Sequence, residues 1–280
     1  MEHKNNPTII ITGASKGVGA ASALAYAKAY PNGINMVLVA RNLAPLENMQ
    51  AQLACYPQCH VLLVQADVAS LSDCERIVAQ TVEQFGFINV LVNNAGLHYR
   101  GDFCKLSAQH VAAMVDVNMR APMVLSALAI KHMPSSEHNA IVMVGSLAGL
   151  TPLQGAATYS GTKAGLRAFT YALHDELITS KINVAVVSPG PIDTGFIMDE
   201  IDQVEDIVYS QPMSSAEQVA DAIVSLSQST KAEIAMPSAS GKLATFSYLF
   251  PSFRRAVRGL LYRIGAKNKE KYRRNTGRDV

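Results

Sequence analysis

A tyrosine and a lysine four positions apart, Tyr159 and Lys163 in the segment YSGTK, have the types and spacing to move a proton. Residues four apart share one face of a helix, so the phenol and the ammonium group would lie side by side. A free phenol has a pKa of about 10, and a nearby positive charge lowers it by stabilising the phenolate. Tyr159 could then exchange a proton with a carbonyl or alcohol oxygen. Ser146, at the end of a predicted strand, could donate a hydrogen bond to the same oxygen.

Each of these residues also has an ordinary interpretation. A Tyr-x-x-x-Lys pair is most often an amphipathic tyrosine beside a solvated lysine, and a serine after a strand is more often a cap or turn residue. The chemistry therefore depends on the elements that would bring Ser146, Tyr159 and Lys163 together.

Seven short apolar runs, rich in β-branched residues and leucine, predict strands that are buried on both faces of a parallel sheet. They are Thr8–Ile11, Asn35–Val39, Val61–Val64, Asn89–Val92, Ala140–Val144, Val184–Val187 and Glu233–Ala235. Longer segments between them carry apolar residues at helical spacing, for example Leu166, Phe169, Leu173 and Leu177. Such alternation predicts an α/β, doubly wound, seven-stranded parallel Rossmann-type sheet with helices on both faces, and a ligand at the carboxyl ends of the strands.

Composition agrees with one large globular body. The chain has 280 residues, of which 49% are hydrophobic and 16% charged, and this excludes disordered, collagen-like and coiled-coil chains. We predict one dinucleotide-binding and catalytic domain over residues 1–240 and a basic amphipathic extension over 241–280. The four cysteines are scattered without a C-x-x-C pair, which favours reduced thiols and a cytoplasmic protein. No leader is expected in residues 1–10, and no membrane span is expected because no run of about 20 apolar residues occurs.

The segment TGASKGVG, residues 12–19, lies between the first predicted strand and a helix and predicts a phosphate site. Gly13 can make the tight turn, Gly17 leaves room for a phosphate beside backbone N–H groups, and Gly19 lets the helix pack close to the sheet. A helix N-terminus then favours the anion. The loop contributes Gly13, Ser15, Lys16, Gly17, Val18 and Gly19 to the predicted cofactor site.

The end of the second strand bears on the choice of cofactor. An acidic residue there would bind the ribose 2′-OH of NAD, but the chain has Arg41 instead, with Lys16 in the loop. Two cations suit a 2′-phosphate, so NADP(H) is expected in preference to NAD(H), although Arg41 could be a solvated loop charge. Asp67 and Val68 follow the third strand. The Asp67 carboxylate could bind the adenine amino group or cap the next helix near Ser70.

Taken together, these segments resemble the short-subunit branch of the short-chain dehydrogenase/reductase family. The matching motifs are Thr12-Gly13-x-x-x-Gly17-x-Gly19, Asp67, Asn93-Asn94-Ala95-Gly96, Asn118, Ser146, Tyr159-x-x-x-Lys163 and Pro189-Gly190-x-x-x-Thr194. They occur in order and at the family's spacing over more than four-fifths of the chain. One small departure is Gly145, where many members have serine before the catalytic serine.

The resemblance implies a role for each of these residues. Tyr159 would be the general acid or base, Lys163 would bind the nicotinamide ribose and lower the Tyr159 pKa, and Ser146 would hold the substrate oxygen. Asn118 would hold a water that relays protons from Lys163. The cofactor would carry the hydride, and no metal is required. The remaining cofactor contacts would come from Asn94, Ala95, Gly96, Pro189, Gly190 and Thr194.

The predicted function is therefore an NADP(H)-dependent oxidoreductase for a carbonyl compound or secondary alcohol. Loops Leu97–Asp102, Leu147–Gly155 and Phe196–Gln211 would frame the substrate, and their apolar residues suit a hydrophobic lipid-, steroid- or acyl-like molecule. We expect His98 to be a half-exposed loop residue. We expect the acidic residues between 193 and 206 to form the solvated face of a mobile lid. The alternatives are a catalytically silent nucleotide sensor or scaffold and, on the same site, a non-redox lyase or isomerase.

The last forty residues differ in charge from the rest. From Lys242 to Val280 there are 11 basic and 2 acidic residues. An apolar stripe runs along this segment at helical spacing, which could rest in a membrane interface or pack against the body or a second subunit. Nucleic acid binding is disfavoured because no binding module is present. The resemblance also implies a homodimer or homotetramer, through the helices that carry Asn118 and Tyr159. The stripe consists of Phe250, Phe253, Val257, Leu260, Leu261 and Ile264.

Overall fold

A single parallel sheet of seven strands forms the centre of the molecule. The structure, a computed structural model, describes residues 6–275. Its strands are β1 (Thr8–Thr12), β2 (Ile34–Ala40), β3 (Cys59–Gln65), β4 (Val90–Asn93), β5 (Asn139–Val144), β6 (Ile182–Pro189) and β7 (Glu233–Met236). They lie in the order β3-β2-β1-β4-β5-β6-β7, so the direction of winding reverses between β1 and β4. The predicted fold class is confirmed.

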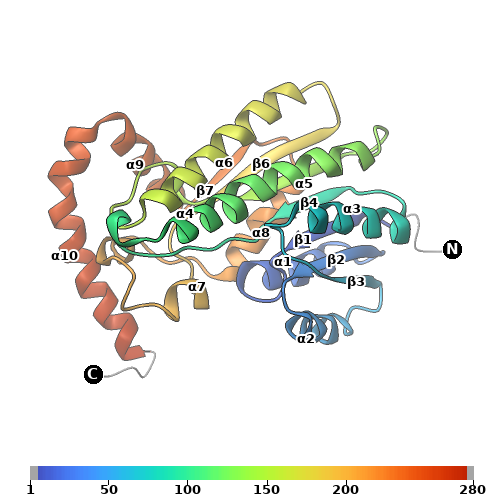
Figure 1. The fold of residues 1–280 in the computed structure, drawn as a ribbon, viewed down its shortest axis with the longest axis horizontal. Helices are drawn as coiled ribbons and strands as arrows, with labels where there is room; N and C mark the ends of the chain where they lie inside the picture. Colours follow the sequence, from blue (N-terminus) through green and yellow to red (C-terminus); the bar gives the residue numbers. More distant parts are fainter. Residues whose placement is uncertain (1–5, 276–280) are drawn as a thin grey trace.

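Helices cover both faces of the sheet (Figure 1). One face carries α1 (Gly17–Ala29), α2 (Leu43–Leu53) and α8 (Ala216–Ser227), and the other carries α3 (Leu71–Phe85), α5 (Ala121–Ala129) and α6 (Ala157–Glu176). A helix α4 (Ala108–Val115) continues into α5 through a π-helical turn at Asp116–Arg120. A short helix α7 (Gly195–Met198) follows β6, and α9 (Ser238–Leu249) and α10 (Pro251–Asn275) follow β7. Short 3-10 turns include η2 (Phe103–Lys105), η4 (Ile130–His132), η5 (Leu147–Gly149) and η6 (Asp206–Ser210).

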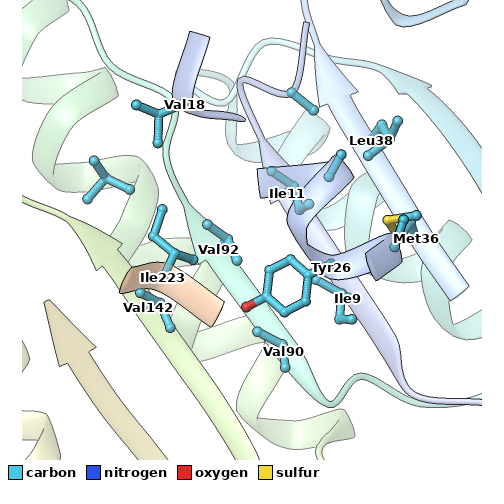
Figure 2. Close-up of a cluster of buried hydrophobic side chains, with 14 of the residues drawn as sticks. Ile9, Ile11, Val18, Tyr26, Met36, Leu38, Val90, Val92, Val142 and Ile223 are labelled. Atoms are coloured by element: carbon cyan, nitrogen blue, oxygen red, sulfur yellow. The ribbon is translucent and has the colours of Figure 1, made fainter. Parts of the chain in front are cut away.

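The strands are continuously apolar because successive side chains enter two different cores. Ile9 and Ile11 of β1 pack toward α1 and α8, whereas Ile10 between them packs toward α3 and α5. Figure 2 shows the first of these cores, in which Tyr26 of α1 lies among side chains of β1, β2 and β4. Full burial of one such aliphatic side chain contributes about 2 kcal/mol. Two hydrophobic cores, one on each face, therefore stabilise the sheet whose carboxyl edge is expected to bind the ligand.

One helix has the length and apolar composition of a membrane span, contrary to our expectation. It runs from Ala108 to His132 through α4, the π-helical turn and α5, with a mean hydropathy of 1.3. Its inner face is part of the core, since Met114, Asn118 and Leu125 are buried there. Length and composition alone do not distinguish such a core helix from a span.

The C-terminal segment docks partly through polar contacts that the sequence did not indicate. The stripe residues Phe250 and Leu260 are exposed, and Tyr262, Asn268 and Lys269 of α10 instead contact η6 and the loop before it. Hydrophobic periodicity identifies the apolar face of a helix but gives no information on what its polar face contacts. Here the polar face of α10 contacts acidic residues. The boundary predicted at residue 240 falls within α9 and stays a prediction. Arg278, the last basic residue of the extension, lies outside the described residues.

Candidate active site

The glycine-rich loop forms the turn between β1 and α1, as expected. Gly13 and Gly17 have φ values of +67° and +56°, which residues with a side chain rarely adopt. A Cβ on Gly19 would overlap the carbonyl oxygen of Gly13, so this glycine is required for close packing. The N-cap residue of α1, Lys16, makes no side-chain cap hydrogen bond. The first N–H groups of α1 are therefore left for an anionic ligand.

Asn94 ties this loop to the end of β4. Its Nδ2 donates to the carbonyl oxygens of Thr12, at 2.8 Å, and Gly13, at 3.2 Å. In return, Thr12 Oγ1 accepts from the backbone N–H groups of Asn94 and Ala95, both at 3.0 Å. The two strands at the switch point are thus joined at their carboxyl ends, where a doubly wound sheet binds its ligand.

The cations predicted for the 2′-phosphate are present at this edge. Lys16 and Arg41 are both exposed and line the same cavity. Asp67 lines it too, with Oδ1 accepting from the N–H of Ala69 at 3.0 Å. The cap of α3 is Ser70, so Asp67 is not the capping residue. Its carboxylate stays exposed at the cavity wall, where an adenine could reach it.

Tyr159 and Lys163 lie in the first turns of α6, on the side that faces the cavity. Lys163 is buried, and its Nζ donates to the carbonyl oxygen of Val144 at 2.8 Å and lies 5.7 Å from the centre of the Tyr159 ring. Burial lowers the pKa of Lys163 to about 8. Ser146 follows β5, and its hydroxyl accepts from the N–H of Ala148 at 3.1 Å.

Burial raises the pKa of Tyr159 in the protein by itself, while the hydrogen bond with Ser146 and the charge of Arg100 oppose that rise. The part that the resemblance gives Lys163, lowering the Tyr159 pKa, stays a prediction. The Tyr159 pKa rises because a desolvated phenol favours its neutral form. A lowered pKa would need a further positive charge, such as that of an oxidised nicotinamide.

Asn118 lies in the π-helical turn between α4 and α5 and is fully buried. Its Oδ1 accepts from the N–H of Leu97 at 2.9 Å, and its Nδ2 donates to the carbonyl oxygen of Leu97 at 2.8 Å. The amide thus satisfies both backbone groups of one residue just beyond β4. Such π-helical turns often occur at functional sites, and this one holds the loop that follows β4 against the helix.

One cavity of about 1100 Å³ at the carboxyl edge brings nearly all of the predicted residues together. Asn118 and Gly19 are not part of its wall. Asn118 contacts the wall residue Leu97, and Gly19 packs against the wall residue Gly13. The predicted residues that line the cavity are Gly13, Ser15, Lys16, Gly17, Val18, Arg41, Asp67, Val68, Asn94, Ala95, Gly96, Ser146, Tyr159, Lys163, Pro189, Gly190 and Thr194.

His98 is more closely involved than we expected. Its ring stacks on that of Tyr159, and its Nδ1 lies 3.0 Å from a guanidinium nitrogen of Arg100. Because a guanidinium can only donate, His98 Nδ1 is the acceptor and the proton resides on Nε2. Burial, then Arg100 and Lys163, lower the pKa of His98 to about 3, so the ring is neutral at physiological pH.

Arg100 connects this ring to the loop after β6, a contact that no sequence pattern indicated. Its Nε donates to Glu200 at 2.9 Å, and a terminal nitrogen donates to the carbonyl oxygen of Phe196 at 2.7 Å. Three more carboxylates of this loop region pair with α10, in the contacts Asp202–Arg273, Glu205–Tyr262 and Asp206–Lys269. These carboxylates still reach solvent, since the side chain of Asp202 is 76% exposed and that of Glu200 is 44% exposed, so the acidic face is both solvated and paired.

A charged cluster fixes α6 to the sheet one turn beyond Lys163. Arg167 donates to both carboxylate oxygens of Glu233 in β7, with a shortest distance of 2.7 Å. Tyr171 and Ser188 donate to the same carboxylate at 2.8 and 2.7 Å. Burial would raise the pKa of Glu233, but these donors outweigh it and keep the pKa below its usual value. The spacing of Arg167 and Tyr171 was visible in the sequence, but their common partner was not.

The C-terminal helices also line the cavity. Leu243 and Tyr248 of α9 and Arg254, Val257 and Arg258 of α10 belong to its wall. Figure 1 shows α10 along the side of the molecule where the strands end. The extension therefore contributes to the site, a role that its sequence pattern did not reveal.

The fold and this cavity define a doubly wound α/β protein with a dinucleotide-type loop and a Tyr-x-x-x-Lys pair on one ligand site. The family model for short chain dehydrogenases matches residues 7–205. The chain belongs to the short-chain dehydrogenase/reductase family, whose members are oxidoreductases that act on CH–OH groups.

Individual relatives agree with this assignment. An NADP-dependent 3-hydroxy acid dehydrogenase of Schizosaccharomyces pombe is 31% identical over 70% of this chain and 75% of its own length. The 11-beta-hydroxysteroid dehydrogenase-like 2 protein of Arabidopsis thaliana is 30% identical over 76% of this chain and 69% of its own. The crystal structure of levodione reductase matches with a TM-score of 0.75 at 22% identity, over 84% of this chain and 98% of that one, a similarity of fold.

Proposed function

We propose that this protein is an NADP(H)-dependent oxidoreductase that interconverts a hydrophobic carbonyl compound and its secondary alcohol. The observation that carries the proposal is the position of Tyr159 and Lys163 on the wall of the cavity that also receives the glycine-rich loop. A silent sensor or scaffold has no need of a buried lysine beside a tyrosine, since burial of an ammonium group is costly.

The chain's own residues fit a nicotinamide dinucleotide. The uncapped N-terminus of α1 and the positive-φ glycines before it suit a pyrophosphate. Lys16 and Arg41 suit a 2′-phosphate, because a guanidinium can bind it through two hydrogen bonds. The S. pombe relative is described as NADP-dependent, which supports the same choice. When bound, the cofactor would supply or accept the hydride.

Tyr159 supplies or removes the proton in this scheme. During reduction its hydroxyl donates a proton to the substrate oxygen as the carbonyl carbon receives the hydride, and during oxidation the same atom takes the proton back. Ser146 holds that oxygen by a hydrogen bond. Lys163 binds the ribose, and a relay of protons through Lys163 and Asn118 returns Tyr159 to its starting state.

Apolar residues around the cavity favour a hydrophobic substrate. Leu147, Leu153 and Phe196 of the predicted substrate loops line it, and α9 and α10 add Leu243 and Leu261. Pockets of this kind bind through apolar area and use a few polar groups for orientation. One relative is described as an 11-beta-hydroxysteroid dehydrogenase-like protein, and a steroid is a largely apolar molecule.

The proposal includes a cytoplasmic homodimer or homotetramer that associates through the helices that carry Asn118 and Tyr159. Light scattering of the purified protein tests this, and a single species at the 30.0 kDa monomer mass would contradict it.

Peripheral contact with a membrane through α9 and α10 is also proposed, because Phe246, Leu249 and Phe250 are exposed there beside basic residues.

Calorimetric titration with NADPH and NADH is the first test, followed by NADPH oxidation with carbonyl compounds of increasing apolar size. We expect NADPH to bind at least tenfold more tightly than NADH and turnover to rise with apolar size. Arg41→Asp should remove the nucleotide preference. If it leaves NADPH strongly preferred, our interpretation of Arg41 is wrong.

Tyr159→Phe distinguishes an enzyme from a sensor. The variant should lose at least a thousandfold in turnover and still bind NADPH, because the phenyl ring keeps the shape of the site and lacks only the proton donor. Tight nucleotide binding without turnover of any carbonyl by the wild type would favour the sensor. Turnover without a change in NADPH absorbance would favour a lyase or isomerase.

A further inference from the structure

The charge on the cavity wall is almost all of one sign. Among the described residues that line the cavity, seven are cationic and one, Asp67, is acidic. The cationic residues are Lys16, Arg41, Arg100, Lys163, Arg254, Arg255 and Arg258. Four of them have an assignment already, since Lys16 and Arg41 suit the cofactor, Lys163 belongs to the catalytic pair and Arg100 pairs with Glu200. The three arginines of α10 remain.

The α10 arginines are too far from Arg41 to serve the same phosphate. Arg41 follows β2, whereas α9 and α10 follow β7 at the opposite edge of the sheet. Five strand spacings separate β2 from β7, which is roughly 24 Å at about 4.8 Å per strand. Figure 1 shows the same separation, with α10 on one side of the molecule and α2 well away from it. The two groups of cations therefore do not bind the same phosphate.

The two halves of α10 use their charges differently. In the second half, Lys269 pairs with Asp206 at 3.0 Å and Arg273 pairs with Asp202. In the first half, neither Arg254 nor Arg258 has an ion pair or a side-chain hydrogen bond among residues 6–275, and Arg255 contacts only the Ser252 hydroxyl, at 3.3 Å. The carboxylate of Glu205 accepts a hydrogen bond from Tyr262, further along this helix.

Helical spacing places Arg254 and Arg258 on the same face as two apolar residues of the cavity wall. Positions 254, 258 and 261 lie one turn apart in succession, and Val257 and Leu261 line the cavity beside them. Arg254 is partly buried. A guanidinium that lies at a largely apolar wall and forms no ion pair leaves strong donors available, and their natural partner is a carboxylate or phosphate.

We infer that Arg254 and Arg258 bind an anionic group on the substrate, so that the substrate is an amphipathic carbonyl compound or alcohol with an apolar body and a carboxylate or phosphate end. This inference rests on the proposed function, because it names the substrate class of the same cavity. Arg255 lies beside them at the wall and adds charge. The reacting oxygen lies at Tyr159, the apolar body contacts the leucines of α9 and α10, and the anionic end lies at the arginines.

The test uses three ten-carbon probes below their micelle-forming concentrations: decyl phosphate, decanoate and decanol. Calorimetry of the NADPH-saturated protein should show both anions binding at one site per chain, at least tenfold more tightly than decanol. The ratio between decyl phosphate and decanoate identifies which anion the site prefers. Arg254→Gln and Arg258→Gln should each lower anion affinity at least tenfold and leave decanol unchanged.

Arg263→Gln is the matched control. It removes one charge from the same helix at an exposed position outside the cavity wall, so anion affinity should change less than twofold. Equal affinity for decanol and the anions in the wild type would overturn the inference, as would an equal loss in the Arg258→Gln and Arg263→Gln variants. Tyr159→Phe should still bind the anions, so failure of the catalytic proposal is distinguishable from failure of this one.

Discussion

The imidazole ring of His98 lies flat against the phenol ring of Tyr159, with centroids 4.3 Å apart and ring planes inclined by 16°. Because Arg100 occupies Nδ1 and the site is desolvated, this imidazole stays neutral and acts as a flat support for the tyrosine. The ring restricts the orientations that Tyr159 can adopt. Arg100 also contacts Glu200 and Phe196, so it connects the loop after β6 to the His98 ring that stacks on Tyr159.

The low pKa of His98 predicts a specific dependence of stability on pH. In the folded protein this pKa is about 3, against 6.5 for a free histidine, so between these values the unfolded chain binds the additional proton. The contribution of His98 to the free energy of unfolding is fully present above pH 6.5 and falls as the pH is lowered toward 3. His98→Gln removes the titration, and the stability of the wild type relative to the variant should decrease from pH 7 to pH 5 in urea unfolding. A constant difference would show that the ring is solvated.

Lys163 predicts a change of stability in the alkaline pH range. Its folded pKa of about 8 lies below the usual 10.5, so the folded protein loses this proton first as the pH rises. The burial penalty is fully present below pH 8 and disappears toward pH 10.5, and a shift of this size corresponds to about 3 kcal/mol. Lys163→Met should therefore gain stability relative to the wild type at pH 7, and the gain should shrink at pH 10. Lys28→Met, at an exposed site, controls for general loss of charge; an equal pH dependence there would refute the assignment.

Two glycines of α10 form a matched pair for testing how that helix docks. A Cβ on Gly265 would overlap the backbone carbonyl of Asp206, whereas nothing lies within 4 Å of the same atom on Gly259. Gly265→Ala should release α10 from η6, increase proteolysis after residue 250 and weaken substrate binding. Gly259→Ala should stabilise the helix by about 1 kcal/mol. Thermal unfolding and limited proteolysis of both variants provide the measurement, and equal behaviour of the two would contradict the docking.

The exposed apolar surface of α9 and the start of α10 predicts binding to anionic vesicles. Leu249 and Phe250 are 66% and 52% exposed, and cations of α10 lie beside them. Co-sedimentation with vesicles containing phosphatidylserine should exceed that with phosphatidylcholine alone, and Leu249→Ser with Phe250→Ser should reduce it several-fold. Leu71→Ser, at a 52% exposed leucine of α3, should have no effect. Equal sedimentation of all three proteins would exclude a membrane contact here.

The sheet was predictable because its strands carry a pattern that only double burial explains. Ile9, Ile10 and Ile11 are all apolar since they enter two cores, and no helix or exposed strand needs such a run. The loop at residues 12–19 and the Tyr159–Lys163 pair were found for a similar reason, since their spacing within one element is itself the signal. Each of these predictions depended on the types and spacing of residues within one short segment of the chain.

The parts that could not be predicted are contacts between distant segments. Arg100 meets Glu200 across a hundred positions, and Arg167 meets Glu233 from another element. Neither pair has a spacing that a sequence could reveal. The stripe on α10 was visible, and two of its residues, Val257 and Leu261, line the cavity. Hydrophobic periodicity does not report the polar contacts of Tyr262 and Lys269 that also hold this helix. Burial of a loop histidine likewise depends on what packs over it.

The cavity is assembled from two stretches of chain with different constraints. The glycine-rich loop and Tyr159 lie within residues 7–205, which match the family model, whereas Leu243, Tyr248, Arg254 and Arg258 come after that match ends. Chemistry and recognition can therefore diverge separately. Exchange of α9 and α10 between relatives would transplant a substrate wall onto an unchanged reaction centre, so the final helices are the natural module for redesigning what this oxidoreductase accepts.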